Sequence, residues 1–454
     1  MITQQIGIFS RPYRALTIGI ILTVTAVAFE GLAVTTVAPL LTDQLGGVAF
    51  YGWIFSAYSL GQLVGTVFAG QAVDAYGTAR PFVIAALLFA IGLAAAAAAA
   101  TMPIVIVGRA LQGLGAGALN TCVYSSINLV YDDHLRPRML AAFSSAYVIP
   151  AMIGPYIAGT IAERLTWRLV FLGLLPFVAI AVVLTLPSFR RLLGQGQRIN
   201  RRRTIAAVQL AIGTGLLLSG LGQLPDLIGS AQAVIGLALL VPPLRRLLPG
   251  GTLIARSELP ALVASRGLLI ASYFGAATYV VLALDQIHGY RADVAGLVVA
   301  SGSLSWSVGA TLQARLDGRD GGRGRRGRVI VGLALIVVGI AAVLPIVWID
   351  QIVLPVAIAA HAIMGLGIGL AHATSGAIAF ALAAEGTEGV VSSNLLIADS
   401  FTPAVSIGVG GALVAIGAAS SWAASIGIGG ALVISLVLSV LGLIAAYRLP
   451  QERA

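Results

Sequence analysis

The segments VGRALQGLGAGAL (residues 107–119) and AAHAIMGLGIGLA (residues 359–371) repeat one glycine-rich pattern, and each lies inside a long apolar run. A membrane chain whose two halves carry the same helix-packing pattern is expected to be a duplicated, two-lobed transporter. At one aligned position the copies differ, with Arg109 in the first and His361 in the second. The matching glycines, at a constant offset of 252 residues (361 − 109), are Gly113, Gly115 and Gly117 against Gly365, Gly367 and Gly369.

The composition indicates a polytopic membrane protein. Hydrophobic residues make up 58% of the 454 residues and charged residues only 10%, whereas soluble chains are about one quarter charged. All 27 basic residues are arginine, which gives a net charge of +10. Because the arginines lie between apolar runs, we interpret them as topology signals and expect no nucleic-acid partner.

Several kinds of chemistry are not expected. The single cysteine, Cys122, excludes an intrachain disulfide and makes a metal cluster unexpected. There is no GxxxxGKS/T loop, no HExxH and no CxxC pair. We therefore expect no enzyme activity, no metal and no cofactor, with a proton gradient as the energy source.

At about 20 apolar residues per crossing, the sequence predicts 14 membrane spans. Most arginines between them fall on one side, and the opposite side holds only Arg164, Arg168 and Arg291 near helix ends. This bias predicts cytoplasmic termini. The membrane is expected to be a bacterial cytoplasmic membrane. The first apolar run lacks a small-residue cleavage site and is expected to stay as a helix. The expected spans are 15–41, 51–73, 81–101, 103–130, 139–162, 168–188, 204–224, 226–244, 260–284, 293–313, 328–348, 352–383, 391–418 and 422–447.

An arginine-rich break, FRRLLGQGQRINRRR at residues 189–203, follows the sixth span. It predicts an N-terminal six-helix lobe at residues 1–188, a linker with two inserted helices at 189–256, and a C-terminal six-helix lobe at 257–454. A second arginine run, residues 316–328, is expected to be a flexible loop.

A short loop with the sequence GQAVDAYGTARP (residues 70–81) lies between the second and third spans. Its aspartate and arginine are suited to hold two helix ends in one conformation, although simple turn chemistry is an alternative. The loop resembles the signature loop of the major facilitator superfamily, except that Ala75 replaces the usual basic residue. The resemblance implies a gating role for Gly70, Asp74, Gly77 and Arg80.

The fourth span places Arg109 and Gln112 one turn apart, before the glycine series. A buried arginine costs several kcal/mol unless it faces a wet cavity or an acidic partner, which favours function, with structural anchoring as the alternative. The string resembles the fourth-helix motif of the superfamily, whose arginine faces the central cavity and influences proton binding.

The fifth span contains PAMIGPYIAG (residues 150–159), in which proline and glycine allow a kink and close helix packing. It resembles the motif of the antiporter branch, with Ala158 replacing one of two final glycines. The resemblance favours export and implies a conformational role for Gly154, Pro155 and Gly159.

Glu30 is the only charged residue in the first span, within AVAFEGLAVTTVAPL at residues 26–40. Because hydrocarbon disfavours an ionised carboxyl group, Glu30 is our first candidate for the proton carrier; the alternative is that it only pairs with Arg109. The segment is similar to the first helix of the 14-helix drug/proton antiporters, with Glu30 in place of the usual aspartate.

Further candidates lie in the second lobe. Residues 279–299 resemble the outer end of the ninth span in the same branch, where Gln286 matches a characteristic glutamine. Asp285 and Asp399 are candidate titratable sites, although Asp285 is also suited to be a helix-end acid. His361 titrates near neutral pH unless shifted and is a further proton-coupling candidate. The candidates for the substrate cavity are Gln112, Tyr147, Gln286, Tyr273 and Trp306.

Together these patterns predict an all-α membrane protein with the major facilitator fold, two six-helix lobes plus two inserted helices. The expected function is proton-coupled efflux of amphiphilic or hydrophobic small molecules, such as drugs, by a monomer in the lipid bilayer. A lipid or amphiphile exporter, or a proton-coupled nutrient importer, are the alternatives.

Overall fold

The computed structural model describes residues 7–450 except residues 133, 195 and 384–387. Every regular element of this described part is a helix, which confirms the predicted all-α class. Thirteen helices in it are long and apolar enough to cross a membrane. The helix α2 (Tyr51–Tyr76) is of similar length and lies among them, so the predicted count of 14 spans fits the structure.

The N-terminal lobe contains the first six spans. The last of them, expected as one helix over 168–188, is divided at Gly173 and Leu174. Pro176 lies in the first turn of the second piece, where a missing N–H costs nothing, so it starts a new helix there. The helices are α1 (Arg14–Leu45), α2, α3 (Ala79–Ala97), α4 (Met102–Val130), α5 (Arg136–Arg164), α6 (Arg168–Leu172) and α7 (Leu175–Phe189).

The C-terminal lobe follows two intervening helices. Short 3-10 turns occupy Val48–Phe50, Thr252–Ile254 and Leu344–Val347. The intervening helices are α8 (Arg201–Gly222) and α9 (Leu227–Leu247), and the lobe consists of α10 (Leu259–Gln286), α11 (Ala292–Asp320), α12 (Arg325–Val343), α13 (Val353–Ala381), α14 (Glu388–Ala419) and α15 (Ala424–Ala446).

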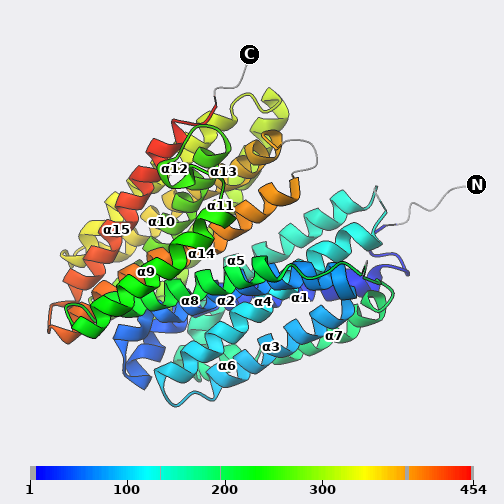
Figure 1. Cartoon of the computed structure of the whole chain (residues 1–454). Coiled ribbons are helices and arrows are strands. Elements are labelled where there is room, and N and C mark those ends of the chain that lie inside the picture. Colours follow the sequence, from blue (N-terminus) through cyan, green and yellow to red (C-terminus); the bar gives the residue numbers. More distant parts are fainter. Residues whose placement is uncertain (1–6, 133, 195, 384–387, 451–454) are drawn as a thin grey trace, which may run out of the picture.

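The two lobes pack their helices in the same way. In the first, α4 lies against both α2 and α3, and α1 lies against α5 and α7. In the second, α13 lies against α11 and α12, and α10 lies against α14 and α15. Between lobes, α5 packs on α11 and α14 packs on α2. Figure 1 shows the two bundles diverging toward the end that carries both termini.

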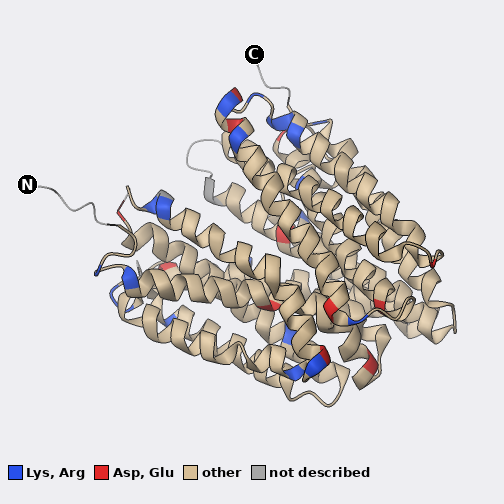
Figure 2. Cartoon of the chain, turned by 180° about the vertical axis from the view of Figure 1, so that it is seen from behind, with Lys and Arg blue, Asp and Glu red and all other residues tan. Residues whose placement is uncertain are grey.

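We call the end with the start of α1 and the end of α15 the arginine-rich end, and the opposite one the far end. Figure 2 shows basic residues gathered near the termini, with a smaller group at the opposite end of the bundles. The lobes are joined by hydrogen bonds at the far end, where Gln286 Nε2 donates to Asp43 Oδ1 at 2.7 Å. The Ala292 amide donates to Glu163 Oε1 at 2.8 Å.

The pair α8 and α9 packs through glycines. A Cβ atom added at Gly213 would lie 2.7 Å from the Leu240 nitrogen, and one at Gly229 would lie 2.9 Å from the Gly220 carbonyl oxygen. Only hydrogen at these positions lets the helices approach so closely. Two apolar neighbours of the pair, Leu63 of α2 and Phe401 of α14, lie in one cluster with it, so the pair covers one seam between the lobes.

The arginine run at residues 316–328 differs from the expected flexible loop. The helix α11 continues to Asp320 and α12 begins at Arg325. Asp317 accepts from Arg325 Nε at 2.8 Å and from Arg328 Nη2 at 2.7 Å. These pairs lie between the two helix ends, which explains why both helices extend into the run.

Candidate functional site

The glycine series of α4 sets the position of the first-lobe site. A Cβ atom at Gly113 would collide with the backbone of Tyr58 on α2, and one at Gly115 would lie 2.6 Å from Phe89 on α3. The glycines therefore let α4 lie directly against both neighbours. One turn before this contact, Arg109 is held against the backbone of α2.

Glu30 of α1 and Arg109 of α4 form an ion pair between Oε1 and Nη1. The two side chains are 0% and 1% exposed, so water does not screen the pair. Such a pair is stable only because each charge compensates the other, and removal of either partner leaves an isolated charge in a low-dielectric interior. The structure thus brings together the two residues that the sequence predicted as proton carrier and modulator.

Arg109 has three further partners. Its Nε donates to the carbonyl oxygen of Ile54 at 2.9 Å, and its Nη1 donates to Gln112 Oε1 at 2.5 Å. Its guanidinium carbon lies 4.4 Å from the centre of the Tyr58 ring. In contrast, no hydrogen bond to the Glu30 carboxylate occurs among the described residues. Arg109 is therefore anchored independently of Glu30, whereas Glu30 depends on Arg109 alone.

The second copy of the repeat packs in the same manner. A Cβ atom at Gly365 would collide with the backbone of Gly302 on α11, as one at Gly113 would collide with Tyr58. The position that carries Tyr58 in the first lobe thus carries glycine in the second. His361 and the Tyr273 hydroxyl both lie 3.1 Å from where a Cβ of Gly302 would be. His361 is fully buried, and neither ring nitrogen has a hydrogen-bond partner in the described part of the chain.

A second charged cluster lies in the C-terminal lobe, where α10, α13 and α14 meet. Arg266 donates from Nε and Nη2 to the two oxygens of Asp399 at 2.8 and 2.7 Å. Its Nη1 donates to the His372 carbonyl at 2.7 Å and to Ser375 Oγ at 2.9 Å. We call Arg266, His372 and Asp399 the C-lobe triad. It gives Asp399 a partner that the sequence analysis did not identify.

Arg266 was missed although a signal for it existed. It lies within the ninth expected span, where an arginine is as costly as Arg109 is in the fourth and suggests a function by the same reasoning. His372 has no such signal because a single histidine in a span is compatible with ordinary packing.

The signature-loop residues lie at the arginine-rich end of the first lobe. Asp74 and Arg80 are exposed, and Gly77 has a φ of +80°, a conformation that favours glycine. A Cβ atom at Gly77 would lie 3.0 Å from the nitrogen of Gly194 in the linker before α8. Gly70 has only Thr121 nearby, at 3.9 Å. The connection between the lobes thus lies against Gly77, while Asp74 and Arg80 stay exposed.

The α5 motif lies on the seam between the lobes. A Cβ atom at Gly159 would lie 2.6 Å from the carbonyl oxygen of Ala292, and Gly296 approaches Pro155 equally closely. Gly154 instead faces Phe29 of α1, at 3.2 Å. Two of the three motif positions therefore form the contact between α5 and α11.

Asp285 and Gln286 lie at the far end of α10 rather than near Glu30. Gln286 Nε2 also donates to Asp285 Oδ2, at 2.9 Å, so the two residues belong to the joint between the lobes. This position fits the reading of Asp285 as a helix-end acid.

The aromatic candidates divide between the lobes. Tyr147 of α5 donates to Asn120 Oδ1 at 3.3 Å. In the second lobe Tyr273 and Trp306 lie edge to face with ring centres 5.5 Å apart, and Trp306 lies 5.9 Å from His372. The second-lobe pair thus borders the C-lobe triad.

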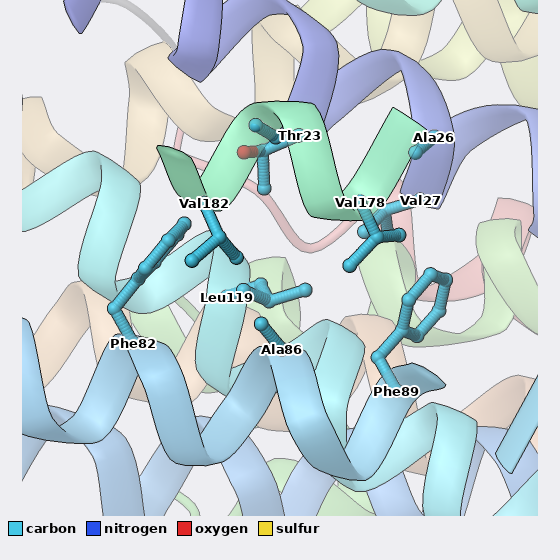
Figure 3. Close-up of a pocket in the computed structure, with 10 residues that line it drawn as sticks. Thr23, Ala26, Val27, Phe82, Ala86, Phe89, Leu119, Val178 and Val182 are labelled. Atoms are coloured by element: carbon cyan, nitrogen blue, oxygen red, sulfur yellow. The ribbon is translucent and has the colours of Figure 1, made fainter. Parts of the chain in front are cut away.

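A small cavity of about 10 Å³ lies between α1, α3, α4 and α7. Figure 3 shows Phe82, Phe89 and Leu119 around it, with Thr23 at one edge. The Thr23 hydroxyl donates to the Gly19 carbonyl and offers little to a guest. Because an apolar void of this size stays dry, we regard it as a packing gap.

Comparison with known proteins gives a family match over most of the chain. A family model described as Major Facilitator Superfamily matches residues 18–407. Two solved structures share the fold. An auto-inhibited POT family peptide transporter is 16% identical with a TM-score of 0.68, and the match covers 96% of this chain and 98% of that chain. The human organic anion transporter MFSD10, also called TETRAN, is 15% identical with a TM-score of 0.56, and the match covers 95% of this chain and 100% of that chain. At these identities the likeness is one of fold.

Curated relatives match over shorter segments. The efflux pump roqT of Penicillium rubens is 31% identical over 189 residues, which is 40% of this chain and 35% of the pump. Multidrug resistance protein 3 of Bacillus subtilis is 27% identical over 165 residues (36% and 32%). Vacuolar basic amino acid transporter 5 of Saccharomyces cerevisiae is 28% identical over 163 residues (36% and 28%). The matches thus span about a third of each relative.

Proposed function

The chain belongs to the Major Facilitator Superfamily, and on that premise we propose that it exports amphiphilic or hydrophobic small molecules in exchange for protons. It is a multi-pass membrane transporter by family and by its membrane-length helices. Among the relatives, an efflux pump and a multidrug resistance protein favour export. Because another relative is a basic amino acid transporter, the tests below also allow for other substrates.

The observation that carries the proposal is the buried pair of Glu30 and Arg109. Glu30 has one charged partner and no other hydrogen bond among the described residues, so its charge state depends on where Arg109 lies. A carboxyl group in this setting is suited to take up a proton in one conformation and release it in another. Arg109, anchored through Ile54 and Gln112, sets the field that Glu30 experiences.

The contacts between the lobes suggest which conformation this is. The hydrogen bonds from Gln286 to Asp43 and from Ala292 to Glu163 join the lobes at the far end. If the arginine-rich end is cytoplasmic, the far-end joint closes the outer side, and this is the state that loads substrate from the cytoplasm. Rocking about the midplane would then break the joint and release substrate outside.

In this cycle a proton and a cationic substrate compete for the Glu30 carboxylate, so protonation of Glu30 lowers the affinity for the substrate. The signature-loop residues Asp74 and Arg80 would stabilise the opposite state, in which the arginine-rich ends approach. Gly159 of α5 and Gly296 of α11 allow these two helices to move against each other along the seam.

The test is ethidium transport in inside-out vesicles that contain the chain. We expect an imposed proton gradient, acidic inside, to drive ethidium uptake, and Glu30→Gln to abolish that dependence. Asp226→Asn removes an acid at an exposed helix start and serves as the matched control. Gradient-driven uptake that persists in Glu30→Gln would show that another group carries the proton, and uptake that ignores the gradient in the unmodified chain would rule out antiport.

A further inference from the structure

We propose that the C-lobe triad is a second proton-binding site, in which a proton and Arg266 compete for Asp399. The proposal goes beyond the role given to Glu30, because it concerns a different lobe and three residues that the first site does not contact. It rests on the hydrogen-bond geometry of the triad, its exposure and its position between helices.

All five N–H donors of Arg266 have an acceptor. Two of these N–H groups donate to Asp399, one donates to the His372 carbonyl and one to Ser375. The fifth lies 2.7 Å from His372 Nε2. Because arginine has no acceptor atom, His372 Nε2 accepts this bond, and the ring carries its proton on Nδ1. The triad therefore holds one positive and one negative charge, with a neutral histidine.

One added proton has two places to bind in the triad, and each of them weakens the hold of Arg266. On Asp399 the proton neutralises the carboxylate that receives two charge-assisted bonds. On His372 Nε2 it removes an acceptor of Arg266 and creates a donor, with Asp399 Oδ2 at 3.6 Å as the available acceptor. Proton uptake and the closed triad thus exclude each other.

The C-lobe triad is more exposed to solvent than the pair of Glu30 and Arg109. The side chains of Asp399 and His372 are 24% and 29% exposed, whereas Glu30 and Arg109 are at most 1% exposed. At 1.5 Å per residue, Asp399 lies roughly 16 Å from the start of α14 and Glu30 roughly 24 Å from the start of α1. The triad is therefore both nearer the start of its helix and more exposed than Glu30.

Few other charges surround the triad. On α10 the nearby titratable group is Tyr273, which is buried, and α11 contributes the uncharged Trp306. On α8, Arg203 donates to Ser393, closer to the start of α14. The sequence of α15 has no charged residue, and α2 has only Asp74, at its exposed end. The charge state of the triad is thus set mainly by its own members.

The position of the triad links proton uptake to movement. Arg266 joins α10 to α14, and α14 is the helix that packs on α2 of the other lobe. Opening the triad removes the charged link between α10 and α14, while the hydrogen bond from Thr402 Oγ1 to the Gly267 carbonyl still joins the two helices. The second proton would therefore act on the seam between α2 and α14, while the first acts within the N-terminal lobe.

Infrared spectroscopy of the full chain in liposomes tests the site without any need for transport. We expect acidification to produce a protonated-carboxyl band that Glu30→Gln retains and that is lost when Asp399→Asn is added to Glu30→Gln. Because Asp399→Asn leaves the Arg266 charge buried and endangers folding, the double variant Arg266→Gln/Asp399→Asn removes both charges together. A band that survives when Glu30→Gln is combined with each of the two Asp399 variants would overturn the proposal.

Transport gives a second readout. With ethidium as the probe and pyranine trapped in proteoliposomes, the ratio of protons to ethidium should fall by about one in Arg266→Gln/Asp399→Asn. It should stay unchanged in the Asp226→Asn control, and an unchanged ratio in the double variant would also overturn the proposal. A lost infrared band without any proton-coupled transport in the unmodified chain would support the second site while refuting the proposed function.

Discussion

Substitution of Glu30 and substitution of Arg109 are expected to lower the free energy of unfolding by different amounts. Both side chains are fully buried, so no discount for solvent screening applies, and breaking such a pair costs about 3–5 kcal/mol. In Glu30→Gln, Arg109 keeps the Ile54 carbonyl, Gln112 and the Tyr58 ring, which puts the loss near the lower limit, about 3 kcal/mol. In Arg109→Gln the Glu30 carboxylate keeps no partner, which puts the loss near the upper limit, about 5 kcal/mol.

The double variant and the pH dependence sharpen this prediction. Glu30→Gln/Arg109→Gln removes both charges and should recover stability to within about 1 kcal/mol of the original chain. In Arg109→Gln the folded state buries an unpaired carboxylate, so it gains by binding a proton that unfolding releases. Its stability should therefore rise as the pH is lowered, whereas Glu30→Gln has no group there to titrate.

The assay is reversible unfolding of the purified chain in mixed micelles, by titration with a denaturing detergent. Losses that simply add in the double variant would show that the two residues do not interact. A Glu30→Gln variant as stable as the original chain would show that Glu30 carries no charge beside Arg109.

Three further predictions follow from packing and burial. Gly113→Ala places a methyl group into the backbone of α2 and should lower the free energy of unfolding by about 1–3 kcal/mol or more. The control Gly31→Ala meets no other atom within 4 Å and should be neutral or stabilising by up to about 1 kcal/mol. Equal losses of stability in thermal unfolding would refute the packing account. Cys122 is fully buried and should react with a water-soluble maleimide only after denaturation, so rapid labelling of the folded chain would contradict its position. With Cys122 replaced by Ala, Asp43→Cys and Gln286→Cys together should be linked by a short bis-maleimide, and the link should stop transport; unimpaired transport in linked protein would show that the far-end joint does not open.

The helices were largely predictable because each crossing needs a long apolar run. The expected spans 352–383 and 391–418 differ from α13 and α14 by only a few residues. The break in the sixth span at Gly173 was not predicted, because Pro176 is compatible with both a kinked helix and a new one. The extension of α11 to Asp320 was missed because ion pairs with later arginines, rather than apolar residues, accompany it.

The candidate sites were predictable only where a residue is costly by itself. Glu30 and Arg109 each interrupt an apolar span, so the sequence indicated both, and the structure pairs them. The C-lobe triad joins residues 106 and 133 positions apart, a contact that no local pattern encodes. The aligned pair Arg109 and His361 illustrates the same limit: the repeat places them at equivalent positions, but the substitution of Tyr58 by Gly302 at the facing position gives His361 a different neighbourhood.

Proton movement during substrate exit is the most direct test of the central claim. Proteoliposomes that contain the chain, loaded with ethidium and trapped pyranine and started without a pH gradient, should acidify inside as ethidium leaves. Glu30→Gln should abolish the acidification that accompanies ethidium exit, and Asp226→Asn should behave as the original chain. Ethidium exit without acidification in the original chain, or full acidification in Glu30→Gln, would contradict proton exchange through Glu30.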